Sequence, residues 1–367
     1  MEFKRTIENR IKEKSFGGKI IIIVGARQVG KTTLSNSILE GYRKKVFNCD
    51  NPTERALLNN KDIEFLKGLV EDAEMIFIDE AQKVKSIGET LKLLVEHFKD
   101  KKQIIVTGSS SINLLDNTHE PLTGRKHVFN LFPLSLNELY QDKLQLMKKF
   151  EQNLIFGSYP EVAKEESFDK KIELLKELST SYLYKDIFEF QEIRNSDLIF
   201  NLLKALALQI GNEVSYNELS KLLGVDKKTV ERYVNLLEKN FIIFRLPPFT
   251  KNKRKEISKL RKIYFFDLGI RNAIINNFNF IESRDDAGQL FENLCILERM
   301  KYREYNGIYA NQYFWRTYDG AEVDLVEERE GDLFAFEFKF RKSSVRKPLG
   351  WNNYKLINKD NILELLK

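Results

Sequence analysis

Residues 19–33, KIIIIVGARQVGKTT, carry the pattern in this chain that is best suited to chemistry. They contain the full G-x-x-x-x-G-K-[ST] spacing, placed after an apolar β-branched run and at the start of a helical segment. Gly25 and Gly30 let the backbone curl so that N–H groups and a helix N-terminus point at phosphate oxygens. Lys31 adds a charge for the outer phosphates, and the Thr32 hydroxyl is a ligand for Mg²⁺. The predicted nucleotide-binding residues are Gly25, Ala26, Arg27, Gln28, Val29, Gly30, Lys31, Thr32 and Thr33.

Two carboxylates, Asp79 and Glu80, follow the apolar run at residues 75–78. Ligands of an open parallel sheet bind at the carboxyl ends of its strands, so both acids are expected beside the bound phosphates. Asp79 is predicted to complete the Mg²⁺ shell. Glu80 is predicted to polarise the water that attacks the γ-phosphate.

The next apolar run, residues 103–106, ends in Thr107-Gly108-Ser109-Ser110. A polar residue at this place commonly lies between the two earlier strands and contacts the γ-phosphate, a role open to Ser109 or Thr107. Ordinary capping of a following helix by Ser110 or Ser111 is the alternative.

Three acids and a lysine form a second constellation nearer the C-terminus. Glu292 falls in a helical segment, Asp324 in EVDLV, and Glu337 and Lys339 in FAFEFKF, where alternate residues share a face. This is the layout of restriction-endonuclease-like folds, in which the three carboxylates hold Mg²⁺ on a scissile phosphate and the lysine supports developing charge. A solvent-facing strand with cross-strand ion pairs is the ordinary alternative.

Residues 197–247 predict three helices, a tight turn and a strand, which together indicate a winged helix-turn-helix. A capping box at Ser215 opens the second helix, and Gly224 makes the turn. DNA binding is favoured, because the basic run 251–262 follows and because the third helix turns polar residues outward. Those residues are Lys227, Lys228, Thr229 and Arg232. A lid or protein-binding role, with a merely solvated basic face, is the alternative.

A chain of 367 residues is too long for one ordinary core. Strands are expected at 20–24, 45–48, 75–78, 103–106 and 127–131, alternating with helices, which predicts a parallel α/β sheet of the P-loop type. Residues 138–195 are predicted to be mostly helical. The expected domains are a P-loop domain at 1–137, a helical lid at 138–195, a winged helix-turn-helix at 196–254, and an α+β restriction-endonuclease-like domain at 255–367.

Composition narrows the class of protein. The formal charge of +6 is mild for this length, and 42% of the residues are hydrophobic. Two cysteines far apart and three histidines argue against a disulfide framework or a His-rich metal site. The charged N-terminus resembles no secretory signal, and no apolar run is long enough to span a bilayer. A cytoplasmic protein without a membrane partner is expected.

Taken together, these motifs resemble a bacterial and archaeal family of AAA ATPases whose members carry a C-terminal domain of unknown function with a restriction-endonuclease-like fold. The matching stretches are GARQVGKTTL, IFIDEAQKV, VTGSSS, LTGR, LFPLSLNEL, GSYPE, GQLFENL, GAEVDLV and FEFKF. The resemblance makes Arg125 a candidate γ-phosphate sensor, in its own subunit or a neighbour's, with a structural salt bridge as the alternative. One departure is that Val323, and not proline, precedes Asp324.

The sequence thus predicts an ATPase that uses ATP and Mg²⁺ and couples its nucleotide state to DNA, with a metal-dependent nuclease centre as an added expectation. The rival hypothesis is a regulatory or signalling ATPase whose winged helix and inert nuclease-fold domain bind protein partners. A homo-oligomer is compatible with either.

Overall fold

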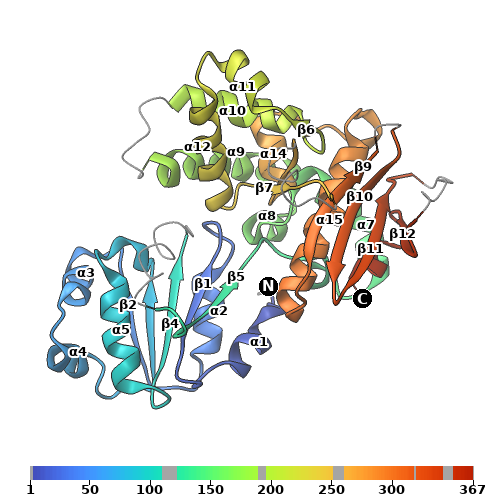
Figure 1. Cartoon of the computed structure of the whole chain (residues 1–367). Coiled ribbons are helices and arrows are strands. Elements are labelled where there is room, and N and C mark those ends of the chain that lie inside the picture. The colour runs from blue at the N-terminus through green and yellow to red at the C-terminus, as the bar shows by residue number, and fades with distance from the viewer. Residues whose placement is uncertain are drawn as a thin grey trace. The chain divides into compact units, whose positions relative to one another are not determined.

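The structure, a computed structural model, describes residues 3–109, 122–188, 196–250, 260–317, 320–341 and 350–366. The chain forms two compact units (Figure 1). The first consists of Lys4–Phe132 with Lys239–Phe241, and the second of Met1–Phe3, Pro133–Glu238 and Ile242–Lys367. Among the helices of these described ranges, none is long and apolar enough to cross a membrane.

The first unit is built on a parallel sheet with the strand order β2-β3-β4-β1-β5 (Figure 1). Its strands are β1 (Ile20–Val24), β2 (Lys44–Asn48), β3 (Met75–Asp79), β4 (Gln103–Gly108) and β5 (Lys126–Asn130). β1 is buried at every residue, as expected for an apolar central strand of a parallel sheet. The five predicted strands are therefore confirmed, and β4 lies between β1 and β3.

Helices flank this sheet: α1 (Ile7–Glu13), α2 (Lys31–Ile38), α3 (Pro52–Asn59), α4 (Ile63–Leu69) and α5 (Ile87–Phe98), with a short 3₁₀ turn η1 (Ala81–Lys83). Ile20, Ile22 and Val24 share one core cluster with apolar side chains of α3, α4 and α5. Side chains alternate along a strand, so Ile21 and Ile23 face the opposite side of the sheet. Both faces of β1 are thereby covered, which fixes where its carboxyl end emerges.

The second unit begins with the segment that was expected to be mostly helical. It contains α6 (Leu136–Leu139), α7 (Lys143–Phe156), α8 (Pro160–Lys164) and α9 (Phe168–Phe188). Asp142 caps α7 by accepting a hydrogen bond from Gln145 N at 2.8 Å, and Pro160 occupies the first turn of α8.

Three helices and a small antiparallel sheet follow: α10 (Ser196–Leu208), β6 (Glu213–Val214), α11 (Tyr216–Leu223), α12 (Lys227–Lys239), β7 (Ile243–Leu246) and β8 (Arg261–Phe265). Ser215 accepts a hydrogen bond from Glu218 N, and Gly224 ends α11 with a φ of 66°. The strand order is β6-β8-β7. The boundary expected at residues 254 and 255 falls between β7 and β8, which are paired strands in the structure.

The C-terminal part combines α14 (Leu268–Ile274), α15 (Ala287–Asn306), two 3₁₀ turns, η3 (Ile281–Ser283) and η4 (Ile362–Leu366), and a sheet of order β12-β11-β10-β9. The strands are β9 (Asn311–Arg316), β10 (Glu322–Arg329), β11 (Asp332–Phe338) and β12 (Asn353–Ile357). A fully buried ion pair, Arg299 to Glu327 at 2.8 Å, joins α15 to β10. The predicted β9–β10 hairpin and the Glu292 helix are both present.

Candidate functional site

The loop from Gly25 to Gly30, between β1 and α2, closes around the Lys31 ammonium. Lys31 Nζ donates hydrogen bonds to the carbonyl oxygens of Gly25 and Ala26, both at 2.9 Å, and the residue is only 5% exposed. Gln28 and Gly30 take left-handed φ angles of 57° and 96°, which turn the chain into α2. The first N–H groups of a helix lack partners within that helix, so this corner combines a helix N-terminus with a lysine charge.

Two neighbouring contacts hold the loop. A Cβ on Gly25 would lie 2.1 Å from the carbonyl oxygen of Leu131, so only glycine fits there. The buried Arg5 guanidinium donates to the carbonyl oxygens of Val29 and Phe132, each at 2.7 Å. No motif in the sequence singles out Arg5, because it precedes the loop by twenty positions and belongs to no recognisable pattern.

Asp79 is held on both carboxylate oxygens. The Thr32 hydroxyl donates to Asp79 Oδ2 at 2.9 Å, and the Thr107 hydroxyl donates to Asp79 Oδ1. These oxygens come from α2, β3 and β4, which meet because β4 lies next to β3 and β1. Hydroxyl and carboxylate oxygens suit Mg²⁺, which is commonly held by one carboxylate together with substrate phosphates. The residues present therefore fit the predicted Mg²⁺.

Glu80 has a left-handed φ of 54°, and its neighbours fix its side chain. Its backbone N–H donates to the Thr107 hydroxyl at 3.3 Å. Gln82 Nε2 donates to Glu80 Oε2 at 2.5 Å and to the Ser109 hydroxyl at 3.0 Å. Gln82 thus joins two predicted site residues, and the sequence analysis missed it although it lies in the same IFIDEAQKV stretch. The alternative cap residues Ser110 and Ser111 lie outside the described residues.

Arg125 lies at the amino-terminal end of the parallel strands, opposite the end where the loop lies. Its carbonyl oxygen accepts from the N–H of Ile20, the first residue of β1, whereas the loop follows the last residue of that strand. A strand of this length spans about 13 Å. The guanidinium instead forms an ion pair with Glu96 at 2.8 Å, which is the structural alternative to a γ-phosphate sensor. Contact with a nucleotide would require the loop of a neighbouring subunit.

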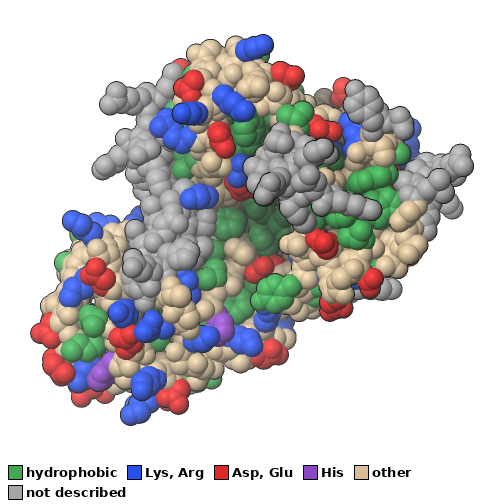
Figure 2. All heavy atoms as spheres, viewed as in Figure 1, with side chains coloured by type: hydrophobic (Ala, Val, Ile, Leu, Met, Phe, Trp, Pro, Cys, Tyr) green, Lys and Arg blue, Asp and Glu red, His purple; other side chains and the backbone are tan. Residues whose placement is uncertain are grey.

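The predicted DNA-binding residues lie at the start of α12. Lys227, Lys228 and Arg232 are exposed. The Thr229 hydroxyl donates to Asp226 Oδ2 at 2.7 Å, so it serves the helix cap. Residues 251–259 of the expected basic run lie outside the described residues. On the face seen in Figure 2, Lys and Arg side chains are interspersed with Asp and Glu, as the mild net charge suggests.

The four residues of the second constellation do come together, with partners that the sequence analysis missed. Lys339 Nζ lies 2.6 Å from Glu337 Oε1, and Phe338 N donates to Asp324 Oδ2 at 2.8 Å. Glu292 Oε1 accepts from Lys262 Nζ at 3.0 Å and from the Tyr264 hydroxyl at 2.5 Å. Lys262 Nζ also lies 2.6 Å from Glu322 Oε1. We call Lys262, Tyr264, Glu292, Glu322, Asp324, Glu337 and Lys339 the carboxylate cluster.

Burial dominates the electrostatics of this cluster. It raises the pKa of Asp324 well above its usual value, and the nearby charges of Glu292 and Glu337 raise it further. Burial likewise raises the pKa of Glu337, against the opposing effect of Lys339. For Lys262, burial alone would lower the pKa, but Glu292, Asp324 and Glu322 raise it above its usual value. Lys262 is therefore an ammonium at neutral pH.

The metal site expected on Glu292, Asp324 and Glu337 stays a prediction. Within the described residues, no three or more His, Cys, Asp or Glu side chains are arranged so that they could hold a metal ion. The Lys262 ammonium contacts Glu292 and Glu322 directly, so both of these acids are paired with a lysine. No local sequence pattern indicates this contact, because Lys262 belongs to a strand of the neighbouring sheet.

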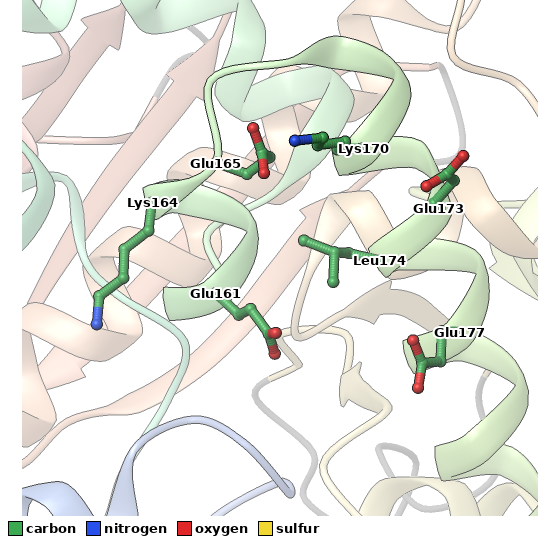
Figure 3. A pocket seen from close by; sticks show the side chains of 7 residues that line it. All are labelled: Glu161, Lys164, Glu165, Lys170, Glu173, Leu174 and Glu177. Atoms are coloured by element: carbon green, nitrogen blue, oxygen red, sulfur yellow. The ribbon is translucent and has the colours of Figure 1, made fainter.

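A pocket between α8 and α9 contains none of the predicted site residues. Glu161, Lys164, Glu165, Lys170, Glu173, Leu174 and Glu177 line it (Figure 3). Acids and lysines are mixed in its lining, and the surface is open to solvent. It offers no enclosed site for a nucleotide.

Family models divide the chain into three parts. A model described as an AAA domain matches residues 17–140, which includes the loop and Asp79. Models described as domains of unknown function match residues 147–280 (DUF8612) and 287–357 (DUF4143).

Relatives match over most of the chain. An uncharacterised protein of Mycobacterium tuberculosis is 25% identical over 341 residues, covering 92% of this chain and 74% of the relative. One from Methanocaldococcus jannaschii is 27% identical over 328 residues, covering 81% and 74%. The solved Walker-type ATPase of Pyrococcus abyssi is similar with a TM-score of 0.52 and 16% identity, covering 75% of this chain and 96% of that one. Residues 17–140 thus match an AAA domain model, and their parallel sheet has the α/β P-loop ATPase-like fold that was predicted.

Proposed function

We propose that this protein binds ATP with Mg²⁺ on residues 25–33 and hydrolyses it. The observation that carries the proposal is the pair of hydrogen bonds that hold Asp79 between Thr32 and Thr107. Lys31 exchanges its contacts with the Gly25 and Ala26 carbonyls for phosphate oxygens. Thr32 and Asp79 hold the Mg²⁺, which neutralises charge on the phosphates when bound.

Glu80 is proposed to orient the attacking water and accept its proton. Its Oε2 is already fixed by Gln82, which leaves Oε1 to face the water. Ser109 is the better candidate for contact with the γ-phosphate, because the Thr107 hydroxyl donates to Asp79. Gln82 links Ser109 to Glu80, so one side chain positions both groups.

The test is ATP binding by the Lys31→Ala variant, measured by isothermal titration calorimetry with Mg²⁺. We expect binding to be lost, since the loop loses the only lysine charge within it. Lys14→Ala, at an exposed lysine of the same unit, is the matched control and retains binding. Unchanged affinity in Lys31→Ala would sink the proposal.

We further propose that nucleotide state alters DNA binding through the winged helix-turn-helix formed by α10, α11, α12 and β6–β8. The exposed Lys227, Lys228 and Arg232 support this. Affinity for duplex DNA should fall steeply with salt, and Lys228→Glu should weaken it at every salt concentration. DNA binding that is absent or insensitive to salt favours the rival, a regulatory ATPase whose C-terminal half binds protein partners.

A metal-dependent nuclease centre in a restriction-endonuclease-like domain is the second candidate. The gathering of Glu292, Asp324, Glu337 and Lys339 supports it, and the Lys262 ammonium among those carboxylates opposes it. Plasmid nicking with Mg²⁺ or Mn²⁺, with and without ATP, tests it against the Asp324→Ala variant. Cleavage by wild type that is lost in Asp324→Ala establishes the nuclease, and no cleavage over several DNA forms excludes it.

A further inference from the structure

Lys262 occupies the centre of the carboxylate cluster. The residue is 4% exposed, and its ammonium lies 3.0 Å from Glu292 Oε1 and 2.6 Å from Glu322 Oε1. The Tyr264 hydroxyl, from the same strand, donates to the same Glu292 oxygen at 2.5 Å. Glu292 Oε1 is therefore fully engaged by two donors from β8.

The position of Lys262 is set by backbone pairing. β8 lies between β6 and β7, and the ammonium also lies 5.5 Å from the centre of the Phe314 ring in β9. Phe314 N donates to the Pro247 carbonyl at 3.0 Å, and Phe249 N donates to the Phe314 carbonyl at 2.6 Å. These bonds tie β9 to the segment that follows β7. The ammonium is thus held by two connected sheets, unlike a surface lysine that moves freely.

An ammonium and a divalent cation compete for this place. Mg²⁺ needs carboxylate oxygens at about 2.1 Å in octahedral geometry, and Glu292 Oε1 is the oxygen that both cations would need. An ammonium and a metal ion that both contact Glu292 Oε1 would repel each other strongly in a buried site. We propose that Lys262 is the resident cation of the carboxylate cluster and that it excludes a divalent metal ion from Glu292.

Removal of Lys262 would free Glu292 Oε1 for a metal ion. The cluster contains four carboxylates and only two ammonium groups, those of Lys262 and Lys339. The carboxylates belong to Glu292, Glu322, Asp324 and Glu337. Glu337 Oε2 is buried and has no hydrogen-bond partner among the described residues. Loss of the Lys262 charge leaves carboxylates without a counter-ion in a buried site, which a divalent cation can replace.

Mn²⁺ binding to the full chain without nucleotide, followed by electron paramagnetic resonance, tests the proposal. In wild type, no saturable Mn²⁺ binding that depends on Asp324 should be seen at millimolar Mn²⁺. Lys262→Gln should bind one Mn²⁺ at least about tenfold more tightly than wild type, and Lys262→Gln with Asp324→Asn should lose it. Arg261→Gln is the matched control, because it removes a positive charge at the adjacent position of β8, on the opposite face.

Saturable Mn²⁺ binding by wild type that is lost in Asp324→Asn would overturn the proposal, and so would a folded Lys262→Gln that gains no metal. Lys262→Arg keeps the cation and should stay insensitive to Mn²⁺. Should Lys262→Gln be only marginally stable without metal, Mn²⁺ should raise its thermal midpoint while leaving that of Arg261→Gln unchanged. If it fails to fold even with Mn²⁺, the wild-type measurement decides alone. This measurement does not depend on ATP hydrolysis, so its outcome tests the role of Lys262 separately from the proposed function.

Discussion

The Thr32 hydroxyl donates a hydrogen bond to Asp79 across 2.9 Å, and this contact joins the first turn of α2 to the carboxyl end of β3. Thr107, from β4, which lies between β3 and β1, donates to the other Asp79 oxygen. Three segments that are far apart in the chain thus orient one carboxylate. Such support is what a pre-organised metal and phosphate site requires.

Glu80→Gln should leave ATP binding unchanged and slow hydrolysis by about 10²-fold or more, because the amide cannot accept the proton of the attacking water. Steady-state phosphate release and nucleotide titration measure the two effects separately. Glu71→Gln, an exposed glutamate of the same unit, serves as the control. Normal turnover in Glu80→Gln would refute the assignment of the base.

Gln82→Ala should lower kcat by about tenfold while the Kd for ATP changes little. The amide orients Glu80 and Ser109 but is not expected to touch the bound nucleotide, and a hydrogen bond to a charged group contributes about 1.5–3 kcal/mol. Gln145→Ala, an exposed glutamine, is the control. Equal losses in binding and turnover would show that Gln82 supports the fold of the site and does not position the base.

Gly25→Ala should destabilise the first unit by about 1–3 kcal/mol, because the added Cβ meets the Leu131 carbonyl oxygen at 2.1 Å. Urea denaturation measures the change. Gly68→Ala, in the last turn of α4 with open space around it, should instead be neutral or more stable by up to about 1 kcal/mol. Equal stability of the two variants would contradict the close approach of β5 to the loop.

Asp267 should make the second unit less stable as pH rises. Burial raises the pKa of Asp267 from 3.8 to about 6, although Ser158 N and Ile270 N donate to it. Between these values the folded state holds the proton more tightly than the unfolded chain, so stability from this group is present at low pH and is lost as pH rises through 6. The shift of about two units corresponds to about 3 kcal/mol.

The Asp267→Asn variant tests the direction of this pH dependence of stability. Its stability relative to wild type should improve by up to about 3 kcal/mol between pH 4 and pH 7, because the amide never ionises. Asp169→Asn, at an exposed position of α9, should show no such trend. A constant difference between Asp267→Asn and wild type across this range would show that Asp267 has an ordinary pKa.

The P-loop domain could be predicted from sequence because its signals are local. The β-branched run at Ile20–Val24, the glycines at 25 and 30, and Lys31 with Thr32 are adjacent in the chain, and local backbone preference forms the strand, turn and helix. The predicted strands follow for the same reason. The capping at Ser215 and the turn at Gly224 were likewise predictable from neighbouring residues.

The remaining features depend on strand order and packing, which no local pattern encodes. Only the tertiary structure places Arg125 at the end of the strands opposite the loop, brings Arg5 against the loop, and pairs β8 with β7. It also decided the character of the carboxylate cluster. The sequence pattern predicted that the acids and Lys339 lie together. The positive charge between Glu292 and Glu322 comes instead from Lys262, on a strand of another sheet. A buried charge is compensated by whichever group the fold places beside it.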